Sequence, residues 1–361
     1  MTDPVDVVVV GGGQAGLAAG YFLRRAGLRF VVLDAQDVPG GAWRRGWDSL
    51  RLFSPAEHSP LPGWWMPAQD GERFPTADHV ARYLRDYERR YDLPVRRPVR
   101  VHGVRDAGAR LAVDTDHGTW HAPFVVSATG TWESPVTPEL PGSAEFAGEQ
   151  LRTVDYRCPE RFRGRRVVVV GGGNSAAQIL AEVSTVATTT WVTRRPPRFM
   201  PDDVDGRVLF DVATRRDAAR RAGTDAQSVS ALGDIVMVPP VREARDRGVV
   251  HARPMFDRLT RDGVAWDGTD AGEGSEQPCD AIIWCTGFRP TLDHLAPLDL
   301  PRPHGVPKTV GTRSVDEPRL HLLGYGDWTG PASATLIGAS RTAKPAVADI
   351  AERLRTERPA P

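Results

Sequence analysis

The sequence predicts an α/β protein with two domains of the same plan, and three observations support this. A run of β-branched residues opens into a glycine turn at Val7–Gly13, and the same VVVVGGG segment returns at Val167–Gly173. A second pair of similar runs, FVVSATG at Phe124–Gly130 and AIIWCTG at Ala281–Gly287, closes each half. A chain of 361 residues is long enough for two domains, and two copies are too few for a solenoid.

Composition and charge narrow the function classes. Lys plus Arg and Asp plus Glu both number 46, so nucleic acid is not expected as a partner, because it requires a cationic surface. No apolar run reaches the roughly 18 residues of a membrane span, and the start of the sequence lacks the basic segment of a signal peptide. We therefore expect a soluble, cytoplasmic protein that acts on small molecules, with a homodimer left open.

The first half alternates apolar runs with glycine and proline punctuation. The run at 5–10 is apolar except at Asp6, as in a buried parallel strand, and 14–26 has an apolar helical face that ends before Gly27. The prolines and tryptophans of 38–76 predict an irregular connection. The remaining elements are expected to be a strand at 30–33, a helix at 77–91, an antiparallel meander at 98–122 and a strand at 124–127.

The second half repeats this order of elements. We expect a strand at 167–170, a helix at 174–184, a strand at 190–193 and a closing strand at 281–284. Residues 196–260, rich in Arg, Asp and Pro, are expected to form a partly helical insertion. The tail has a strand at 320–323 and a helix beginning at 335–343 that Pro345 breaks or kinks.

These elements define the expected domain boundaries. The tail has no sheet of its own, so it is expected to return to the first domain. That domain is then discontinuous, with residues 1–154 and 288–361, and the second comprises 155–287 with the insertion at about 196–260. The second domain is thus inserted into the first.

The first glycine turn has the pattern Gly11-x-Gly13-x-x-Gly16 between a strand and a helix. The first glycine permits the tight turn, the second lets a pyrophosphate approach, and the third lets helix and strand pack closely. The helix N-terminus offers free N–H groups and partial positive charge to the phosphates. Asp34 ends the next strand, where an acid accepts hydrogen bonds from a ribose diol. These residues predict a Rossmann-like dinucleotide site.

The second turn, Gly171-x-Gly173-x-x-Ala176, has the same context but a different ending. Its second strand ends at Thr193–Arg195 and carries no acid. An acid there would repel a 2′-phosphate, whereas Arg can grip it in a fork of charge-assisted hydrogen bonds. The second site is therefore predicted to prefer NADPH over NADH. The alternative is that both arginines are solvated surface charges.

The tail supports assigning the first site to FAD. Gly324–Asp327 follows a strand, and Asp327 could hydrogen-bond a ribityl chain, with a simple turn cap as the alternative. The segment Ala334–Leu336 would start a helix whose positive end faces the flavin pyrimidine and stabilises reduced anionic flavin. The two sites are therefore predicted to hold FAD and NADPH.

Five segments resemble the class B flavin-containing monooxygenases and together span nearly the whole chain. They are Gly11–Gly16, Gly40–Trp43, Ala128–Trp132, Gly171–Ala176 and Cys285–Pro290. Two further segments, Trp47–Pro55 and Leu323–Pro331, resemble one subgroup, ArsO, the flavin-dependent monooxygenase of arsenic-resistance operons. The chain is shorter than most of the family, so large substrate-binding insertions are missing.

The family fingerprint F-x-G-x-x-x-H-x-x-x-[FY] is present with one departure. Phe146 to Tyr156 matches it, but Arg152 stands at the histidine position. In the family this segment lies between the two domains and couples NADP binding to them. Arg keeps a hydrogen-bond donor but cannot act as a neutral imidazole near pH 7. We therefore expect this departure to affect the coupling of NADP binding to the two domains.

The resemblance implies an NADPH-dependent flavoprotein monooxygenase that uses O2. Oxygen would pass through a flavin C4a-(hydro)peroxide to a soft nucleophile, namely a sulfur, nitrogen or As(III) centre, with a role in arsenic resistance if the subgroup resemblance holds. The chemistry resides on the flavin, so neither an acid–base pair nor a metal site is expected.

The expected site residues fall into two groups. Those expected to bind FAD are Gly11, Gly13, Gln14, Ala15, Gly16, Asp34, Ala35, Gly41, Ala42, Trp43, Ala128, Thr129, Gly130, Asp327, Thr335 and Leu336. Those expected to bind NADPH are Gly171, Gly173, Asn174, Ser175, Ala176, Thr193, Arg194, Arg195, Cys285, Thr286 and Gly287.

Other activities share these cofactor motifs. A disulfide reductase needs a redox cysteine pair, and Cys279 and Cys285 lie about 20 Å apart along one predicted strand, too far to bridge. An electron-transfer reductase that passes electrons from NADPH to a partner needs no cysteines, and neither does a non-catalytic flavin redox sensor. A ketone-oxidising Baeyer–Villiger enzyme uses the same flavin adduct as a nucleophile.

Overall fold

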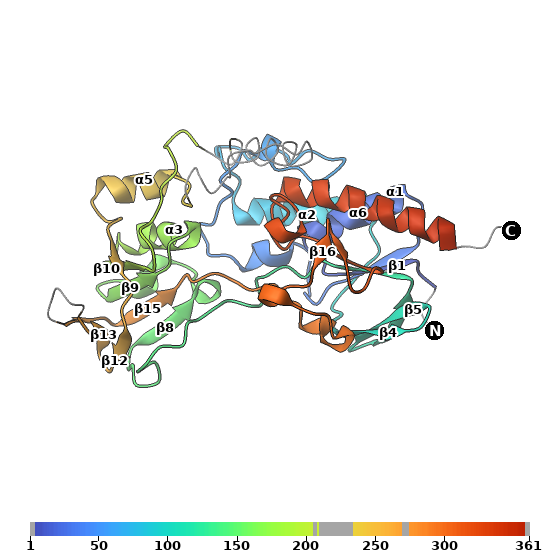
Figure 1. Ribbon diagram of the computed structural model, residues 1–361. Helices are drawn as coiled ribbons and strands as arrows, with labels where there is room; N and C mark the ends of the chain where they lie inside the picture. The colour runs from blue at the N-terminus through green and yellow to red at the C-terminus, as the bar shows by residue number, and fades with distance from the viewer. Residues whose placement is uncertain (1–3, 205–207, 209–233, 269–273, 358–361) are drawn as a thin grey trace, which may run out of the picture. The chain divides into compact units, whose positions relative to one another are not determined.

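The computed structural model describes residues 4–204, 208, 234–268 and 274–357. The chain divides into two compact units: unit 1 is Met1–Arg45, Ser54–Glu133 and Pro290–Pro361, and unit 2 is Gly46–Phe53 and Ser134–Arg289. Each unit is α/β, and unit 2 is inserted into the sequence of unit 1 (Figure 1). Residues 205–207 and 209–233 of the expected insertion lie outside the described residues.

The first unit boundary lies earlier than the expected one after residue 154. Residues 134–154 belong to unit 2 because β8 (Glu149–Arg152) pairs in parallel with β15 (Ala281–Trp284). Pairing with a strand far along the chain therefore decides where this segment packs, and the order of the motifs does not reveal it.

Unit 2 also contains residues 46–53, which the sequence patterns did not assign to it. The ring of Trp47 lies 6.5 Å from that of Tyr156. The hydroxyls of Ser49 and Tyr156 both donate to the Glu182 carboxylate, whose pKa is raised by burial. This short excursion is thus held by an apolar contact and a buried carboxylate.

Unit 1 is built on a seven-stranded sheet. Its order is β16 (Thr309–Val310), β17 (Arg313–Ser314), β18 (Leu320–Leu322), β7 (Phe124–Ser127), β1 (Val7–Val10), β2 (Phe30–Leu33) and β3 (Val95–Arg96). The strands from β18 to β3 are parallel, and β16 and β17 form an antiparallel edge. The tail thus returns to the first sheet. The strand order reverses at β1, and ligands bind such sheets beyond the carboxyl ends of the strands at this point.

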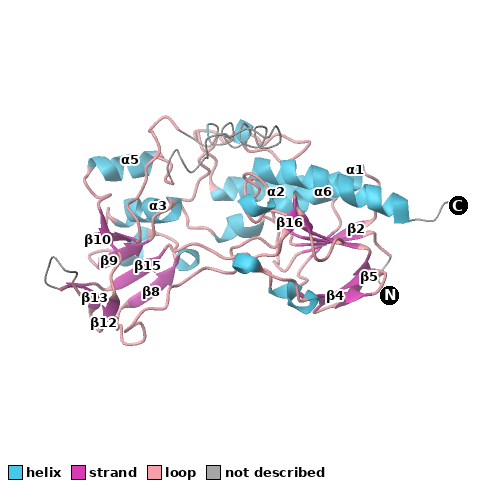
Figure 2. Cartoon of the chain, in the orientation of Figure 1, coloured by secondary structure: helices cyan, strands magenta, loops and turns pink. Residues whose placement is uncertain are grey.

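Helices cover one face of this sheet and a small antiparallel sheet covers the other (Figures 1 and 2). The helices are α1 (Gln14–Arg25), α2 (Ala77–Arg90) and α6 (Leu336–Glu357), and the small sheet is β4 (Val101–Ala107), β5 (Arg110–Thr115) and β6 (Gly118–Ala122). Val8 and Val10 of β1 share an apolar cluster with Val104 and Val113 of the small sheet. The continuous apolar run of β1 follows from burial on both faces.

The tail helix corrects one expectation. α6 continues through Pro345 to Glu357, so the proline does not break it. The helix packs along α1 and buries Ala339, Ala343 and Ile350 completely. Burial of this apolar stripe outweighs the roughly 3 kcal/mol that an internal proline costs.

Unit 2 repeats this plan with a five-stranded, fully parallel sheet. Its order is β11 (Ala252–Pro254), β10 (Thr188–Thr193), β9 (Arg166–Val170), β15 and β8. The helices are α3 (Asn174–Val183) and α5 (Pro239–Asp246). A three-stranded antiparallel sheet, β12 (Arg258–Thr260), β13 (Gly263–Trp266) and β14 (Ser275–Pro278), was not predicted.

Alternate residues of β9 contact different layers of unit 2. Val167 and Val169 cluster with apolar residues of α3, and Val168 and Val170 cluster with Val264 of the antiparallel sheet. The remaining regular segments of the described residues are short 3-10 helices: η1 (Gly41–Arg45), η2 (Ala56–His58), η3 (Thr153–Asp155), η4 (Pro159–Phe162), η6 (Asp293–Leu298), η7 (Pro303–Gly305) and η8 (Asp327–Thr329). Both units therefore place a parallel sheet between helices and a small antiparallel sheet.

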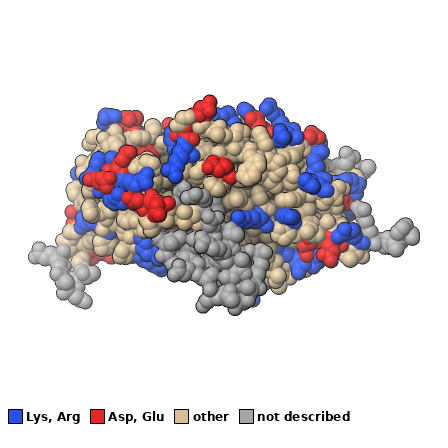
Figure 3. Space-filling view, turned by 90° about the horizontal axis from the view of Figure 1, so that it is seen from above, with Lys and Arg blue, Asp and Glu red and all other residues tan. Residues whose placement is uncertain are grey.

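The surface carries both signs of charge. On the face shown in Figure 3, groups of Lys and Arg alternate with groups of Asp and Glu. Within the described part of the chain, no helix is both long and apolar enough to cross a bilayer.

Two candidate nucleotide-binding sites

The glycine turn between β1 and α1 leaves no room for side chains at two of its positions. Gly11 has a φ of +107°, and an added Cβ would lie 2.5 Å from the Ala128 carbonyl oxygen. A Cβ on Gly16 would lie 1.9 Å from the carbonyl oxygen of Gly11. At Gly13 an added Cβ meets nothing within 4 Å, and Ala15 is buried in the first turn of the helix. The turn is thus tight at two positions and open at the second glycine.

Asp34 directly follows β2 and lies beside this turn. A Cβ on Gly12 would lie 2.5 Å from its Oδ2. This carboxylate is buried: Oδ2 accepts from Nε of Arg97 at 2.6 Å, and Oδ1 accepts from the Gln36 N–H at 3.3 Å. Ala35 is half-buried beside it. The structure brings the predicted acid to the turn, but it is paired with an arginine that the sequence analysis did not identify.

Gln14 connects the turn to two distant segments. Its Oε1 accepts from Nε1 of Trp43 at 2.9 Å, and its Nε2 donates to the Ala334 carbonyl at 2.6 Å. Trp43 lies in η1 together with Gly41 and Ala42. An added Cβ on Gly41 would lie 3.1 Å from the Cα of Gly13, and Ala42 is exposed. The side chain of Gln14 therefore holds neighbouring loops in place.

A buried hydroxyl network holds the loop Ala128–Gly130 beyond β7. The hydroxyl of Tyr325 lies 2.5 Å from Oγ of Ser127 and 2.6 Å from Oγ1 of Thr129. Oγ of Ser127 lies 2.9 Å from Nε2 of His294, and burial lowers the pKa of that imidazole to about 4. In the sequence, Ser127 and Tyr325 stand out only as members of longer motifs, and no pattern marks His294.

The predicted tail residues occupy two successive turns. Asp327 is exposed, and its Oδ1 accepts from the Ala332 N–H at 3.4 Å, the turn-capping role considered for it. Thr335 caps α6, because its hydroxyl accepts from the Gly338 N–H at 3.1 Å. Leu336 is the first helical residue and is buried.

Unit 2 repeats the turn between β9 and α3. Gly171 has a φ of +141°, and an added Cβ would lie 2.2 Å from the Cys285 carbonyl oxygen. At Gly173 an added Cβ meets nothing within 4 Å. Ser175 is half-buried in the first turn of α3, and Ala176, at the third position of the motif, is fully buried. This turn is open at the same place as the turn of unit 1.

The second strand of unit 2 ends in a different residue type. The Gly171 N–H donates to the Val192 carbonyl at 2.9 Å, just as the Gly11 N–H donates to that of Leu33 at 2.8 Å. By this correspondence, Thr193 occupies the position that the acid has in unit 1. It is 4 % exposed, and a Cβ on the middle glycine of the turn would lie 3.8 Å from its Cγ2.

Arg194 and Arg195 follow this threonine and are both exposed. Within the residues that the structure describes, neither guanidinium forms an ion pair or a hydrogen bond. By contrast, Arg198 binds both carboxylate oxygens of Asp234, at 2.8 and 2.9 Å. The two predicted phosphate-binding arginines are thus not committed to a carboxylate in the described part of the chain.

Asn174 stands where Gln14 stands in unit 1, and it also holds a distant segment. Its Oδ1 accepts from the Val236 N–H at 2.8 Å, and its Nδ2 donates to the Asp234 carbonyl at 3.3 Å. In both units, the amide side chain that was expected to bind a nucleotide positions loops beside the turn.

The segment after β15 closes the second site. The Cys285 N–H donates to the Val170 carbonyl at 2.7 Å, which brings this segment against the turn. The Thr286 hydroxyl donates to the Val136 carbonyl. Gly287 has a φ of +89°, and its carbonyl accepts from the Val136 N–H at 2.9 Å.

Both turns fit a dinucleotide pyrophosphate. Neither α1 nor α3 begins with a side-chain cap, so the N–H groups and partial positive charge of each N-terminus can serve a phosphate. The space in front of Gly13 and Gly173 lets the phosphate approach the backbone.

Comparison with known proteins agrees with this architecture. A family model described as pyridine nucleotide-disulphide oxidoreductase matches residues 8–232. The chain is 51 % identical to a flavin-containing monooxygenase from Stenotrophomonas maltophilia, with 98 % of this chain and 100 % of that one covered and a TM-score of 0.88. The chain belongs to the flavin-containing monooxygenase family.

Two curated relatives extend this similarity. The chain is 29 % identical to an uncharacterised CzcO-like oxidoreductase of Geobacillus kaustophilus, with 79 % of this chain and 80 % of that protein covered. It is 26 % identical to the indole-3-pyruvate monooxygenase YUCCA8 of Oryza sativa, with 96 % and 90 % covered. As a family member it is an oxidoreductase of the monooxygenase type with FAD and NADPH as cofactors.

In this monooxygenase the side chain at the family histidine position forms an ion pair with a nearby acid. Arg152 ends β8, and its Nε and a terminal nitrogen donate to the two carboxylate oxygens of Asp155 at 2.8 and 3.1 Å. The guanidinium lowers the pKa of this carboxyl. Arg152 thus shares its charge with an acid three residues away.

The cysteines of the monooxygenase form no disulfide. Cys158, Cys279 and Cys285 are all free. Burial raises the pKa of the Cys279 and Cys285 thiols to about 12, so both stay protonated near neutral pH. The described residues therefore offer no redox pair of the kind that a disulfide reductase needs.

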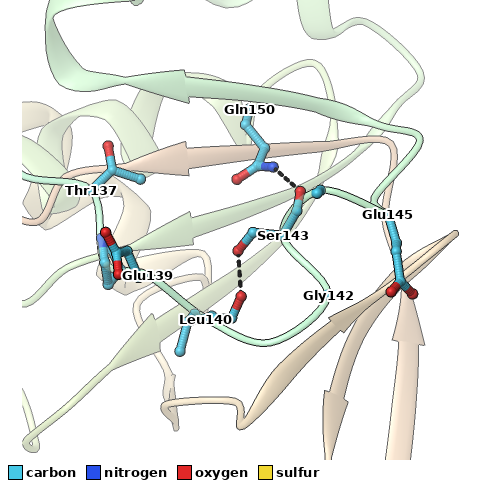
Figure 4. Close-up of a pocket in the computed structure, with 9 residues that line it drawn as sticks. Thr137, Glu139, Leu140, Gly142, Ser143, Glu145 and Gln150 are labelled. Atoms are coloured by element: carbon cyan, nitrogen blue, oxygen red, sulfur yellow. Dashed lines mark hydrogen bonds between the residues drawn. The ribbon is translucent and has the colours of Figure 1, made fainter.

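A pocket of about 500 Å³ lies in unit 2, and no predicted site residue lines it. Its wall is formed by residues 137–140 and 142–145 with Gln150, whose side chain donates to the Ser143 carbonyl at 3.0 Å (Figure 4). The lining includes the carboxylates of Glu139 and Glu145 and, among the described residues, no cationic side chain. These features do not suit an anionic coenzyme.

Proposed function

We propose that this monooxygenase binds FAD in unit 1 and NADPH in unit 2, prefers NADPH over NADH, and oxygenates a soft nucleophile. The observation that carries the cofactor assignment is the difference at one equivalent position. Asp34 follows the second strand of unit 1, whereas Thr193 and two exposed arginines stand there in unit 2. A carboxylate suits a free ribose diol, and guanidinium groups suit a 2′-phosphate.

The residues of each unit have distinct tasks in this proposal. Gly13 and Gly173 leave room for the pyrophosphates, and the N-termini of α1 and α3 stabilise their charge. When bound, FAD supplies hydride acceptance and the reaction with O2, and NADPH supplies the hydride. The chain holds both cofactors and excludes water from the reacting centre.

The substrate class rests on the family and on general chemistry. A sulfide, an amine and a trivalent arsenical each have a lone pair that an electrophilic oxygen can attack. The resemblance of Trp47–Pro55 and Leu323–Pro331 to the monooxygenases of arsenic-resistance operons supports the arsenical and a role in arsenic resistance. The thiols of Cys279 and Cys285 are buried and protonated, so such a substrate would react without being held by them.

Product balance after reduction with NADPH tests this function. The purified protein is loaded with FAD, reduced, and mixed with oxygenated buffer that contains a thioether, a tertiary amine or arsenite. We expect one of these classes to yield oxygenated product that accounts for most of the NADPH consumed, with a matching fall in H2O2. Stoichiometric H2O2 with every class would instead favour an electron-transfer reductase or a redox sensor, with the Arg152 departure as the first cause to examine.

A further inference from the structure

A buried ion triad lies behind the acid of the first site. Nε of Arg97 donates to Oδ2 of Asp34 at 2.6 Å, and its two terminal nitrogens donate to the two carboxylate oxygens of Glu88 at 2.7 and 2.8 Å. The side chains of Arg97, Asp34 and Glu88 are only 10, 6 and 15 % exposed. A guanidinium buried this deeply is expected to have such partners, because an unpaired buried charge is strongly destabilising.

The backbone around Asp34 is also fixed. Its N–H donates to the Arg96 carbonyl at 3.0 Å, and its carbonyl accepts from the Val99 N–H at 2.9 Å. These two bonds involve residues on either side of Arg97, so the end of β2 and the backbone around the arginine are fixed to each other. Glu88 belongs to α2, and it therefore connects that helix to the edge of the nucleotide turn.

The guanidinium of Arg97 is directed at the two acids. All three of its side-chain nitrogens have carboxylate partners, so the group is not placed to grip a phosphate itself. The triad carries a formal net charge of minus one, and among the described residues the Oδ1 atom of Asp34 accepts only from the Gln36 N–H, at 3.3 Å. The negative charge is thus retained for a hydroxyl donor.

We propose that Arg97, held by Glu88, is a positioning residue that fixes the Asp34 carboxylate for the 2′-hydroxyl of the adenosine ribose of FAD. The proposal rests on the ribose-binding role proposed above for Asp34. It implies that Arg97 and Glu88 act on nucleotide selectivity without touching the nucleotide, and that the site favours a free diol over a 2′-phosphate.

Binding of FAD and of its 2′-deoxyadenosine analogue to the apoprotein, followed by flavin fluorescence, tests the proposal. We expect the wild type to bind the deoxy analogue about tenfold more weakly, because the loss of the hydroxyl leaves a buried acceptor unpaired. Asp34→Ala should bring the ratio of the two dissociation constants near one. Arg97→Met should bring it within about twofold of one, and Arg97→Lys should restore part of it.

Two further variants keep the outcome decisive. Glu88→Gln retains an acceptor and is the milder change if Arg97→Met does not fold, and it should reduce the ratio about threefold. Arg29→Met removes the guanidinium that pairs with Asp6, an 8 % exposed carboxylate at the other end of β1, and should leave the ratio unchanged. A wild-type ratio near one, or one unchanged by Asp34→Ala, overturns the ribose role itself. A ratio lost in Asp34→Ala but kept in Arg97→Met and Glu88→Gln overturns only the positioning role.

Discussion

The two nucleotide turns both have a positive φ at their first glycine and an extended second glycine, yet the charges around them are arranged in opposite ways. In unit 1 the arginine beside the second strand, Arg97, is 10 % exposed and shared between two acids. In unit 2, Arg194 and Arg195 are exposed and have no acidic partner among the described residues. The comparison shows that burial and pairing, and not residue type alone, decide whether an arginine positions an acid or can bind a phosphate.

The two turns also differ at the third position of the motif. In unit 1 that position is Gly16, whose added Cβ would lie 1.9 Å from the Gly11 carbonyl oxygen. In unit 2 it is Ala176, which is accommodated with its side chain fully buried. The helix of unit 1 therefore sits closer to its turn than a methyl group allows.

The largest effect is expected from Gly16→Ala. The clash is with backbone atoms that cannot move independently, so unit 1 should lose about 4 kcal/mol or more of stability and most of its FAD. Thermal unfolding of the apoprotein and the FAD content after gel filtration measure both effects. The matched change Ala176→Gly should cost only about 1 kcal/mol. Equal effects of the two substitutions would show that the turns do not differ in closeness.

Acid should destabilise unit 1 before unit 2. Burial lowers the pKa of His294 and His321, both in unit 1, to about 4, although Asp349 lies 3.3 Å from the latter. Because these folded-state values lie below the usual 6.5, the full stability is present above about pH 6.5 and is lost as the pH falls toward 4. At pH 5 the His294 imidazole alone should lower the free energy of unfolding by about 2 kcal/mol.

Urea unfolding at pH 7.5 and 5.0, followed by FAD release and by tryptophan fluorescence, measures this difference. The only histidine of unit 2 is His251, which is exposed. His294→Gln and His321→Gln should each flatten the pH dependence of FAD release, and His251→Gln should not. An equal acid effect on both units would contradict the assignment to these two buried imidazoles.

The coenzyme preference tests the exposed arginines directly. The double variant Arg194→Ala with Arg195→Ala should raise the KM for NADPH about 30-fold, because charge-assisted hydrogen bonds to the 2′-phosphate are lost. The KM for NADH should change little. Arg198→Ala is the matched control, since that arginine is already paired with Asp234. An equal rise in the KM values for NADPH and NADH would contradict the assignment of these arginines to the 2′-phosphate.

The comparison also shows what the sequence could and could not predict. Both glycine turns and the strands around them could be predicted, because a β-branched run, a tight turn and a helix start are adjacent in the chain. Asp34 and Arg194 were predicted for the same reason. Arg97 and Glu88 could not be, since they reach the turn only through the pairing of β3 with β2 and through the packing of α2.

Distance along the chain explains most of the other structural features that the sequence patterns did not predict. Residues 46–53 join unit 2 through contacts with Tyr156 and Glu182, more than a hundred residues away. The strands β12 and β14 are short and mostly polar, so their pairing with β13 was not recognised. For Pro345, the local helix-breaking rule was outweighed by packing of α6 on α1, which no local pattern encodes.

The smallest expected effects come from the two amides that follow the second glycines. Gln14 holds Trp43 and the Ala334 carbonyl, and Asn174 holds the backbone of Val236. Each side chain is bonded to loops of its own unit, so each substitution by Ala should act on one cofactor. Loss of one or two neutral hydrogen bonds corresponds to about 1 kcal/mol, or roughly fivefold in affinity.

Titration of apoprotein with FAD and steady-state titration with NADPH distinguish the two variants. Gln14→Ala should weaken FAD binding about fivefold and leave the KM for NADPH unchanged, and Asn174→Ala should do the reverse. If Gln14→Ala changed both equally, its amide would act on the stability of the whole chain. A selective effect would instead show that the same position in each repeat serves its own nucleotide by holding the loops around it, because neither amide needs to touch the ligand to do so.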